Sequence, residues 1–148
     1  MGACAILALR MRTALQTPAS TLAALRDLAR ERPVEVTVRG GSMAPLLADG
    51  ERVAVAPARR YWPGDVVVFQ AADGRMLVHR LLGFRRSGGA IACITRGDAV
   101  SGQDPPVPLS SLLGRVVAPE RARATAVDRW RAGCAFLRLA ARRLGWRP

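Results

Sequence analysis

Ser42 and His79 are two residues of this chain whose types and sequence context could support nucleophilic catalysis. His79 is the one histidine, and Ser42 lies 37 positions before it, directly after a Gly40-Gly41 pair. A serine hydroxyl becomes a nucleophile when a neighbouring base takes its proton, and lysine and histidine are the usual bases. The chain has no lysine: its 23 other basic residues are all arginine, which stays protonated at biological pH. If the chain is a serine hydrolase, His79 must therefore be the base.

The glycines before Ser42 would let the chain turn where a Cβ would clash, so that the hydroxyl and the backbone N–H of Ser42 are both exposed. A plain turn is the alternative interpretation of this segment. The strand-like run around His79 has a similar alternative, because a lone histidine within a strand is often a core or edge residue. These segments alone leave both alternatives open.

Asp98 and Asp104 follow the next predicted strand and could orient the imidazole. Aspartates in loops are ordinarily turn formers. Their context therefore does not decide between them.

The cysteines and the single histidine indicate whether thiol, metal or cofactor chemistry is to be expected. Cys4, Cys93 and Cys134 are widely separated and form no C-x-x-C pair, which is typical of reduced thiols in a reducing compartment. With a single histidine, no metal site built by the protein is predicted, and no cofactor is expected. The apolar run of residues 3–9 is too short for a membrane span. We therefore expect a cytoplasmic protein.

Periodicity predicts a mainly β fold between helical ends. Residues 20–31 have a helical pattern that stops before Pro33, and the period then changes to two. Strands are expected at residues 34–38, 52–56, 65–70, 76–84, 90–95 and 112–118. Such short strands separated by turns predict an antiparallel sheet or partial barrel. The predicted organisation is a segment of short N-terminal helices (1–32), a β domain (33–119) and a basic C-terminal helix (120–148).

The C-terminal segment carries half of the net charge of +12, because residues 120–148 contain eight arginines and two acidic residues. Apolar residues fall at helical steps of three and four from Val127 through Trp130 and Leu137 to Leu144. This stripe could pack on the sheet, with the arginines in solvent, or lie on an anionic membrane surface. No nucleic-acid recognition motif accompanies the arginines, so no specific nucleic-acid partner is expected.

The order of the motifs resembles that of the serine signal peptidases from about Val34 to Val117. The matching blocks are Gly41-Ser42-Met43-Ala44-Pro45, Leu47-Ala48-Asp49-Gly50-Glu51-Arg52-Val53, Pro63-Gly64-Asp65-Val66-Val67-Val68-Phe69, Val78-His79-Arg80 and Gly97-Asp98. Bacterial leader peptidases and self-cleaving repressors have a lysine where this chain has His79. The archaeal and endoplasmic-reticulum signal peptidases have a His-Arg pair followed by a Gly-Asp block, and this chain is similar to them.

The resemblance implies a nucleophile at Ser42, a base at His79 and an orienting acid at Asp104, with Asp98 as the alternative acid. It also implies an oxyanion site at Ser42 and Gly40, formed by backbone N–H groups and chiefly by that of Ser42. Gly40 lies two residues before the nucleophile, where bacterial relatives often keep a hydroxyl. The expected activity is a serine endopeptidase that cleaves a peptide or protein after a small residue. The family's membrane anchor does not precede the nucleophile box here, so we do not expect a secretory signal peptide as substrate. The alternative function is a catalytically silent β module that binds a peptide or partner and attaches through its arginine-rich tail.

Overall fold

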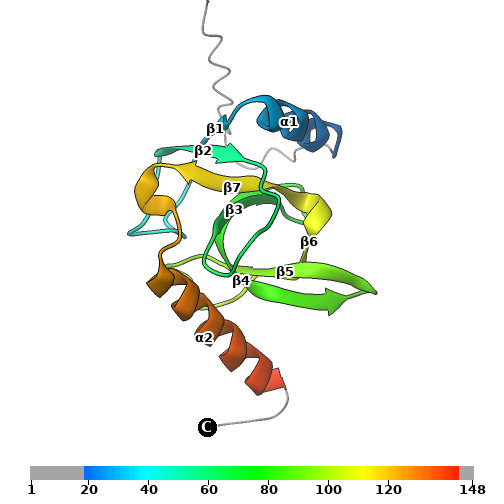
Figure 1. Cartoon of the computed structure of the whole chain (residues 1–148), viewed down its shortest axis with the longest axis vertical. Helices are drawn as coiled ribbons and strands as arrows, with labels where there is room; N and C mark the ends of the chain where they lie inside the picture. The colour runs from blue at the N-terminus through cyan, green and yellow to red at the C-terminus, as the bar shows by residue number, and fades with distance from the viewer. Residues whose placement is uncertain (1–18, 144–148) are drawn as a thin grey trace, which may run out of the picture.

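The computed structural model describes residues 19–143, which form a curled antiparallel sheet with a helix at each end (Figure 1). The bounds of the elements are α1 Ala19–Glu31, β1 Val34–Thr37, β2 Arg52–Ala56, β3 Val66–Gln70, β4 Met76–Ser87, β5 Ala90–Arg96, β6 Val107–Pro108, η1 Leu109–Ser111, β7 Leu112–Ala118, η2 Glu120–Ala122 and α2 Ala126–Arg143. The predicted structure before residue 19 and after residue 143 lies outside the described residues.

The mainly β prediction is confirmed, and each of the six predicted strands is present. The sequence pattern missed β6, because it has two residues and one of them is a proline, which argues against a strand. Strand β4 also continues three residues beyond the predicted end at Phe84. The predicted division into three segments stays a prediction.

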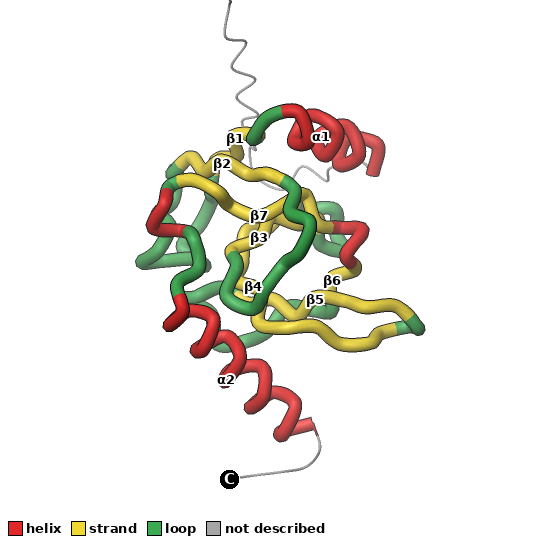
Figure 2. Tube along the Cα trace, viewed as in Figure 1, coloured by secondary structure: helices red, strands yellow, loops and turns green. Residues whose placement is uncertain are grey.

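The strands form one sheet with the order β1-β2-β7-β3-β4-β5-β6, and every pair is antiparallel. The sheet curls into a half-barrel, as the path of the chain in Figure 2 shows. Helix α1 lies at the β1–β2 end, and α2 lies against β4 at the other end (Figure 1). Strands β3, β4 and β5 are therefore in the interior of the sheet, where they can position side chains rigidly.

Strand β4 contributes side chains to two apolar layers. Leu81 joins a core cluster with Val67 and Phe69. The next residue, Leu82, points to the other face and packs with Ile94 under α2. The pairing of β4 with β5 shifts register between Leu81 and Gly83, so both Leu82 and Gly83 lie under α2. Strand β4 therefore contributes to both layers.

Helix α2 packs on the sheet through a face that was not the predicted one. Ala132, Ala135, Phe136 and Leu139 lie against the sheet. Residues of the predicted stripe are exposed instead, with exposed fractions of 56% for Val127, 74% for Trp130 and 67% for Leu137. The interpretation that this stripe packs on the sheet was therefore wrong. Small alanines let the helix approach closely, and a count of large apolar residues undervalues them.

Close packing between α2 and β4 predicts opposite effects for two glycine substitutions. A Cβ on Gly83 would lie 2.7 Å from the Phe136 ring, whereas one on Gly133 in α2 would meet nothing within 4 Å. We expect Gly83→Ala to destabilise the protein by about 1–3 kcal/mol through overpacking. Gly133→Ala should stabilise it by roughly 0.5–1 kcal/mol, because alanine favours a helix interior. Urea denaturation measures both, and equal effects would contradict this account of α2 docking.

Candidate active site

Ser42 lies in a turn that is anchored in the core on both sides. The turn follows β1, and Gly40 has a positive φ of 81° that favours glycine. Directly after Ser42, the side chains of Met43 and Leu47 are fully buried, and Leu47 N donates to Met43 O at 3.0 Å. These contacts fix the position of Ser42.

His79 lies in β4 opposite Val67 of β3, inside the sheet. The residue is 8% exposed, and its ring meets the Phe69 ring edge-on at a centroid distance of 6.1 Å. Its Nε2 lies 3.2 Å from Ser42 Oγ. The structure thus brings together the two residues that the sequence singles out.

Asp104 lies on the other side of the imidazole. Its Oδ2 is 2.6 Å from His79 Nδ1, and it also accepts a hydrogen bond of 2.7 Å from the Thr95 hydroxyl. The backbone N–H of Asp104 donates to Thr95 O at 2.9 Å, which fixes the loop to the end of β5. A carboxylate can only accept, so Nδ1 carries the imidazole hydrogen. In the neutral form of this imidazole, Nε2 is the acceptor that faces Ser42 Oγ, as general-base catalysis requires.

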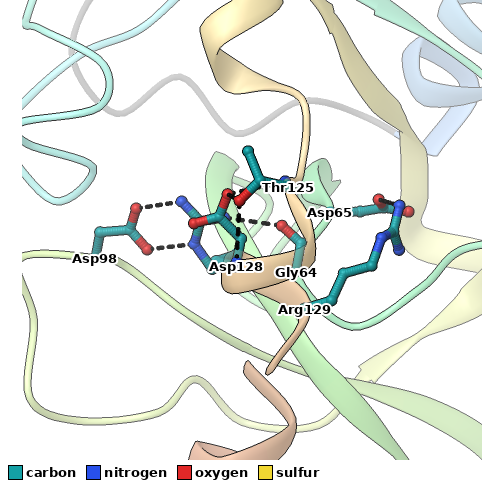
Figure 3. A network of polar contacts seen from close by, with 7 residues as sticks. Gly64, Asp65, Asp98, Thr125, Asp128 and Arg129 are labelled. Carbon is teal, nitrogen blue, oxygen red and sulfur yellow. Dashed lines mark hydrogen bonds and ion pairs between the residues drawn. The ribbon is translucent and has the colours of Figure 1, made fainter. Parts of the chain in front are cut away.

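Asp98 does not contact His79. Both of its carboxylate oxygens accept from Arg80, at 2.7 Å from Nε and 2.7 Å from Nη2 (Figure 3). Arg80 follows His79 in β4, so its side chain points to the opposite face of the strand. The two aspartates that the sequence left as alternatives therefore have different partners.

Arg80 connects strand β4 to α2 and to the loop before β3. Its Nη1 donates to Gly64 O at 2.9 Å and lies 3.7 Å from Asp128 Oδ1 in the first turn of α2 (Figure 3). The hydrogen bonds to Asp98 raise the pKa of the Arg80 guanidinium above its ordinary value, although partial burial opposes them. Arg80 therefore stays charged and holds three segments together.

Thr125 and Asp128 form a capping box at the start of α2. The Asp128 carboxylate accepts from the backbone N–H and the hydroxyl of Thr125, and Asp128 N donates back to the Thr125 hydroxyl. Burial alone would raise the pKa of Asp128, but these hydrogen bonds and the charge of Arg80 outweigh it and lower the pKa. The carboxylate therefore stays ionised beside Arg80.

A second ionic contact fixes α2 to the sheet. The buried Asp65 carboxylate lies 3.4 Å from Arg129 of α2 (Figure 3). It also lies 3.5 Å from Arg115 of β7. Gly64 has a φ of 98°, and a Cβ there would lie 3.0 Å from Arg129 N. Glycine at this position thus permits the close approach of the helix.

The loop that carries Asp98 and Asp104 also contacts Ser42. Ala99 N donates to Ser42 O at 2.9 Å. A Cβ on Gly97 would lie 2.7 Å from Ser42 O and 3.2 Å from His79 Nε2. The bend after β5 therefore needs a residue without a side chain at position 97.

This contact predicts that Gly97→Ala impairs catalysis strongly. The added methyl must displace Ser42 from His79, and misplacement of reacting groups by about 1 Å can cost roughly 100-fold in rate. The matched control is Gly102→Ala in the same loop, where a Cβ meets nothing within 4 Å. Peptide cleavage rates of the two variants test the prediction. Equal rates would contradict it.

The candidate oxyanion donor is the backbone N–H of Ser42. Gly40 N donates to Asp49 Oδ1 at 2.9 Å, so this N–H is already engaged. Within residues 19–143, the Ser42 N–H has no hydrogen-bond partner. It could therefore bind a developing oxyanion.

Residues 19–143 contain no group of three or more His, Cys, Asp or Glu side chains that could hold a metal ion. In the same range, no helix has the length and apolar character needed to cross a membrane.

Sequence reasoning missed Thr95 and the ionic role of Arg80. Thr95 is fully buried, and a hydroxyl within the apolar run Ala90–Arg96 is a signal that could have found it. The Thr125-x-x-Asp128 pattern is likewise a sequence signal for a helix start. Nothing in the sequence pairs Arg80 with residues 18 and 48 positions away.

A buried histidine between a serine hydroxyl and a carboxylate, held by a curled β-sheet, is the arrangement of a serine hydrolase. The comparison with known families agrees with this class: the sequence pattern described as Peptidase S24-like matches residues 7–96. The chain belongs to the Peptidase S24-like family, a family of serine peptidases. The matched range includes Ser42 and His79 and ends before Asp98 and Asp104. None of the curated proteins compared with the chain matches it significantly.

Proposed function

We propose that the chain is a serine endopeptidase that cleaves a peptide or protein by a Ser-His-Asp mechanism. The observation that carries the proposal is the continuous series of contacts from Ser42 Oγ through the His79 ring to Asp104, at 3.2 and 2.6 Å. The family membership supports the same class of reaction. Asp98 is not part of this series, because it pairs with Arg80.

In the proposed mechanism, Ser42 Oγ attacks the scissile carbonyl carbon while His79 Nε2 takes the hydroxyl proton. The oxygen of the tetrahedral intermediate accepts a hydrogen bond from the Ser42 N–H. The C–N bond then breaks, and Nε2 gives its proton to the leaving amine. A water molecule then attacks the acyl carbon and gives a proton to Nε2. As the bond between the acyl carbon and Ser42 Oγ breaks, Nε2 returns this proton to Oγ, and the carboxylic acid product leaves. Asp104 keeps the imidazole in the required tautomer and stabilises its charged form.

Within the Peptidase S24-like family, we propose an activity of the signal-peptidase type, closest to the archaeal and endoplasmic-reticulum members. The support is the Val78-His79-Arg80 block and the later Gly97-Asp98 block. This resemblance implies cleavage after a small residue. The Arg80–Asp98 ion pair gives these two blocks a shared structural role in the chain.

We also propose that the enzyme works in a reducing compartment, the cytoplasm. Cys93 and Cys134 are free thiols, and burial raises the pKa of Cys93 to about 11. A thiol with such a pKa is protonated and unreactive at neutral pH. Cys93 therefore packs as a small apolar side chain.

A peptide library analysed by mass spectrometry tests the proposed function. We expect products from a subset of peptides that share a small residue before the cleaved bond. The Ser42→Ala variant should give none of these products. Unchanged peptides with measurable binding would contradict the proposal and favour the silent binding module.

A further inference from the structure

Helix α2 has two apolar faces on opposite sides. The face formed by Ala132, Ala135, Phe136 and Leu139 lies against the sheet. At 3.6 residues per turn, the exposed Val127, Trp130 and Leu137 lie about half a turn away from that face. The outward face therefore consists of large apolar side chains that do not contribute to the core.

Arginines border this outward face along one side. At the same helical spacing, Arg131, Arg138 and Arg142 lie next to the line of Val127, Trp130 and Leu137. Arg138 and Arg142 form no ion pair within residues 19–143. The one acidic residue of α2, Asp128, is engaged with Thr125 and Arg80. The outward side of the helix is thus apolar and positively charged.

We propose that the outward face of α2 is a docking surface for an anionic lipid bilayer, with the helix axis parallel to the membrane. Interfacial helices bury an apolar face at the headgroup boundary and place arginines beside anionic headgroups. Tryptophan suits this depth because its ring is apolar and its N–H is polar. The exposed border of the helix carries arginines and no carboxylate. Its charge therefore complements an anionic surface and not a basic partner.

The fold can present this surface without rearrangement. The capping box at Thr125, the Arg80–Asp128 contact and the packing of Phe136 on Gly83 hold α2 in place through its other face. Because α2 is tied to the strand of His79, a bound membrane would keep a fixed orientation relative to the candidate active site. Membrane docking does not depend on the proposed peptidase activity.

The first experiment tests whether vesicle binding depends on the arginines of α2 or on the total charge of the protein. Full-length protein is co-sedimented with neutral phosphatidylcholine vesicles and with vesicles that also contain phosphatidylglycerol. We expect binding to the anionic vesicles and roughly 100-fold weaker binding when Arg131, Arg138 and Arg142 are changed to Gln, at about fivefold per arginine near the surface. The matched control changes Arg30, Arg52 and Arg75 to Gln. These exposed arginines lie on other elements, in surface ion pairs of little energetic value.

Equal losses in the two triple variants would overturn the proposal, because binding would then follow net charge alone. Absence of binding by the unchanged protein, or equal binding to neutral and anionic vesicles, would overturn it as well.

The second experiment tests the apolar contact. Added salt screens exposed charges, with a screening length of about 3 Å at 1 M, so binding that survives in high salt reports inserted side chains. We expect Trp130→Ala with Leu137→Ala to remove this residual binding. The control pair is Ile91→Ala with Leu109→Ala, which are exposed apolar residues elsewhere. If both pairs bind alike, the face is not a lipid contact. A dimer in size-exclusion chromatography that Trp130→Ala abolishes, without vesicle binding, would assign the face to a second copy instead.

Discussion

Alanine at Ser42 or at His79 is expected to abolish peptide cleavage while the fold is retained. Under the proposed mechanism, each removes one partner of the proton transfer across the 3.2 Å contact between Ser42 Oγ and His79 Nε2. Loss of such a partner typically lowers the rate by a factor on the order of 10⁴ or more. The measurement is kcat/KM on a peptide cleaved by the unchanged enzyme. Arg80 cannot replace the base, because a guanidinium only donates.

The matched control for Ser42→Ala is Ser87→Ala, at an exposed position at the end of β4. It should cleave at the normal rate. The double variant lacking both Ser42 and His79 should lose no more activity than either single variant, because the two residues act as a unit. Additive losses, or near-normal cleavage by Ser42→Ala, would contradict the assignment.

Asp104→Asn is expected to impair cleavage far more than Asp98→Asn. Asp104 accepts from His79 Nδ1 at 2.6 Å, and an amide at this position no longer holds the imidazole in the productive tautomer. The corresponding change in a serine protease triad costs about 10⁴-fold in kcat. Asp98 instead pairs with Arg80, so its loss should mainly lower thermal stability.

Comparing kcat/KM with the melting temperature separates these two roles. We expect Asp104→Asn to keep a near-normal melting temperature at low activity, and Asp98→Asn to show the reverse. A larger loss of kcat/KM for Asp98→Asn would transfer the orienting role to Asp98. Asp104 would then be a turn residue bonded to Thr95.

The sheet could be predicted because its strands carry local signals. The alternation of buried and exposed residues in β1 and the continuous apolar run of β3 are both visible in the sequence. The order of the strands could not be predicted this way: β7 lies between β2 and β3, and no local pattern specifies such pairing. Strand β6 was missed because two residues are too few to show the alternating pattern of a strand.

The candidate base could be predicted from residue types, because a serine hydrolase without lysine and with one histidine has His79 as its one choice. The candidate nucleophile could not, since the chain has other serines, and the choice of Ser42 rested on the resemblance to the serine signal peptidases. The acid could not, since Asp98 and Asp104 have similar loop contexts. Pairing with Arg80 and His79 depends on the curl of the sheet and the bend at Gly97. For α2, periodicity correctly predicted a helix but gave the wrong packed face, because Ala132 and Phe136, and not the stripe of larger residues, pack against Leu82.

Covalent labelling with a fluorophosphonate tests the central claim most directly, since this reagent phosphonylates a serine that a neighbouring base activates. Peptide mapping by mass spectrometry should find one adduct on Ser42 in the unchanged protein. His79→Ala should label far more slowly, and Ser42→Ala should not be labelled. A label on another residue, or equal labelling of Ser42 with and without His79, would contradict the proposal that His79 activates Ser42.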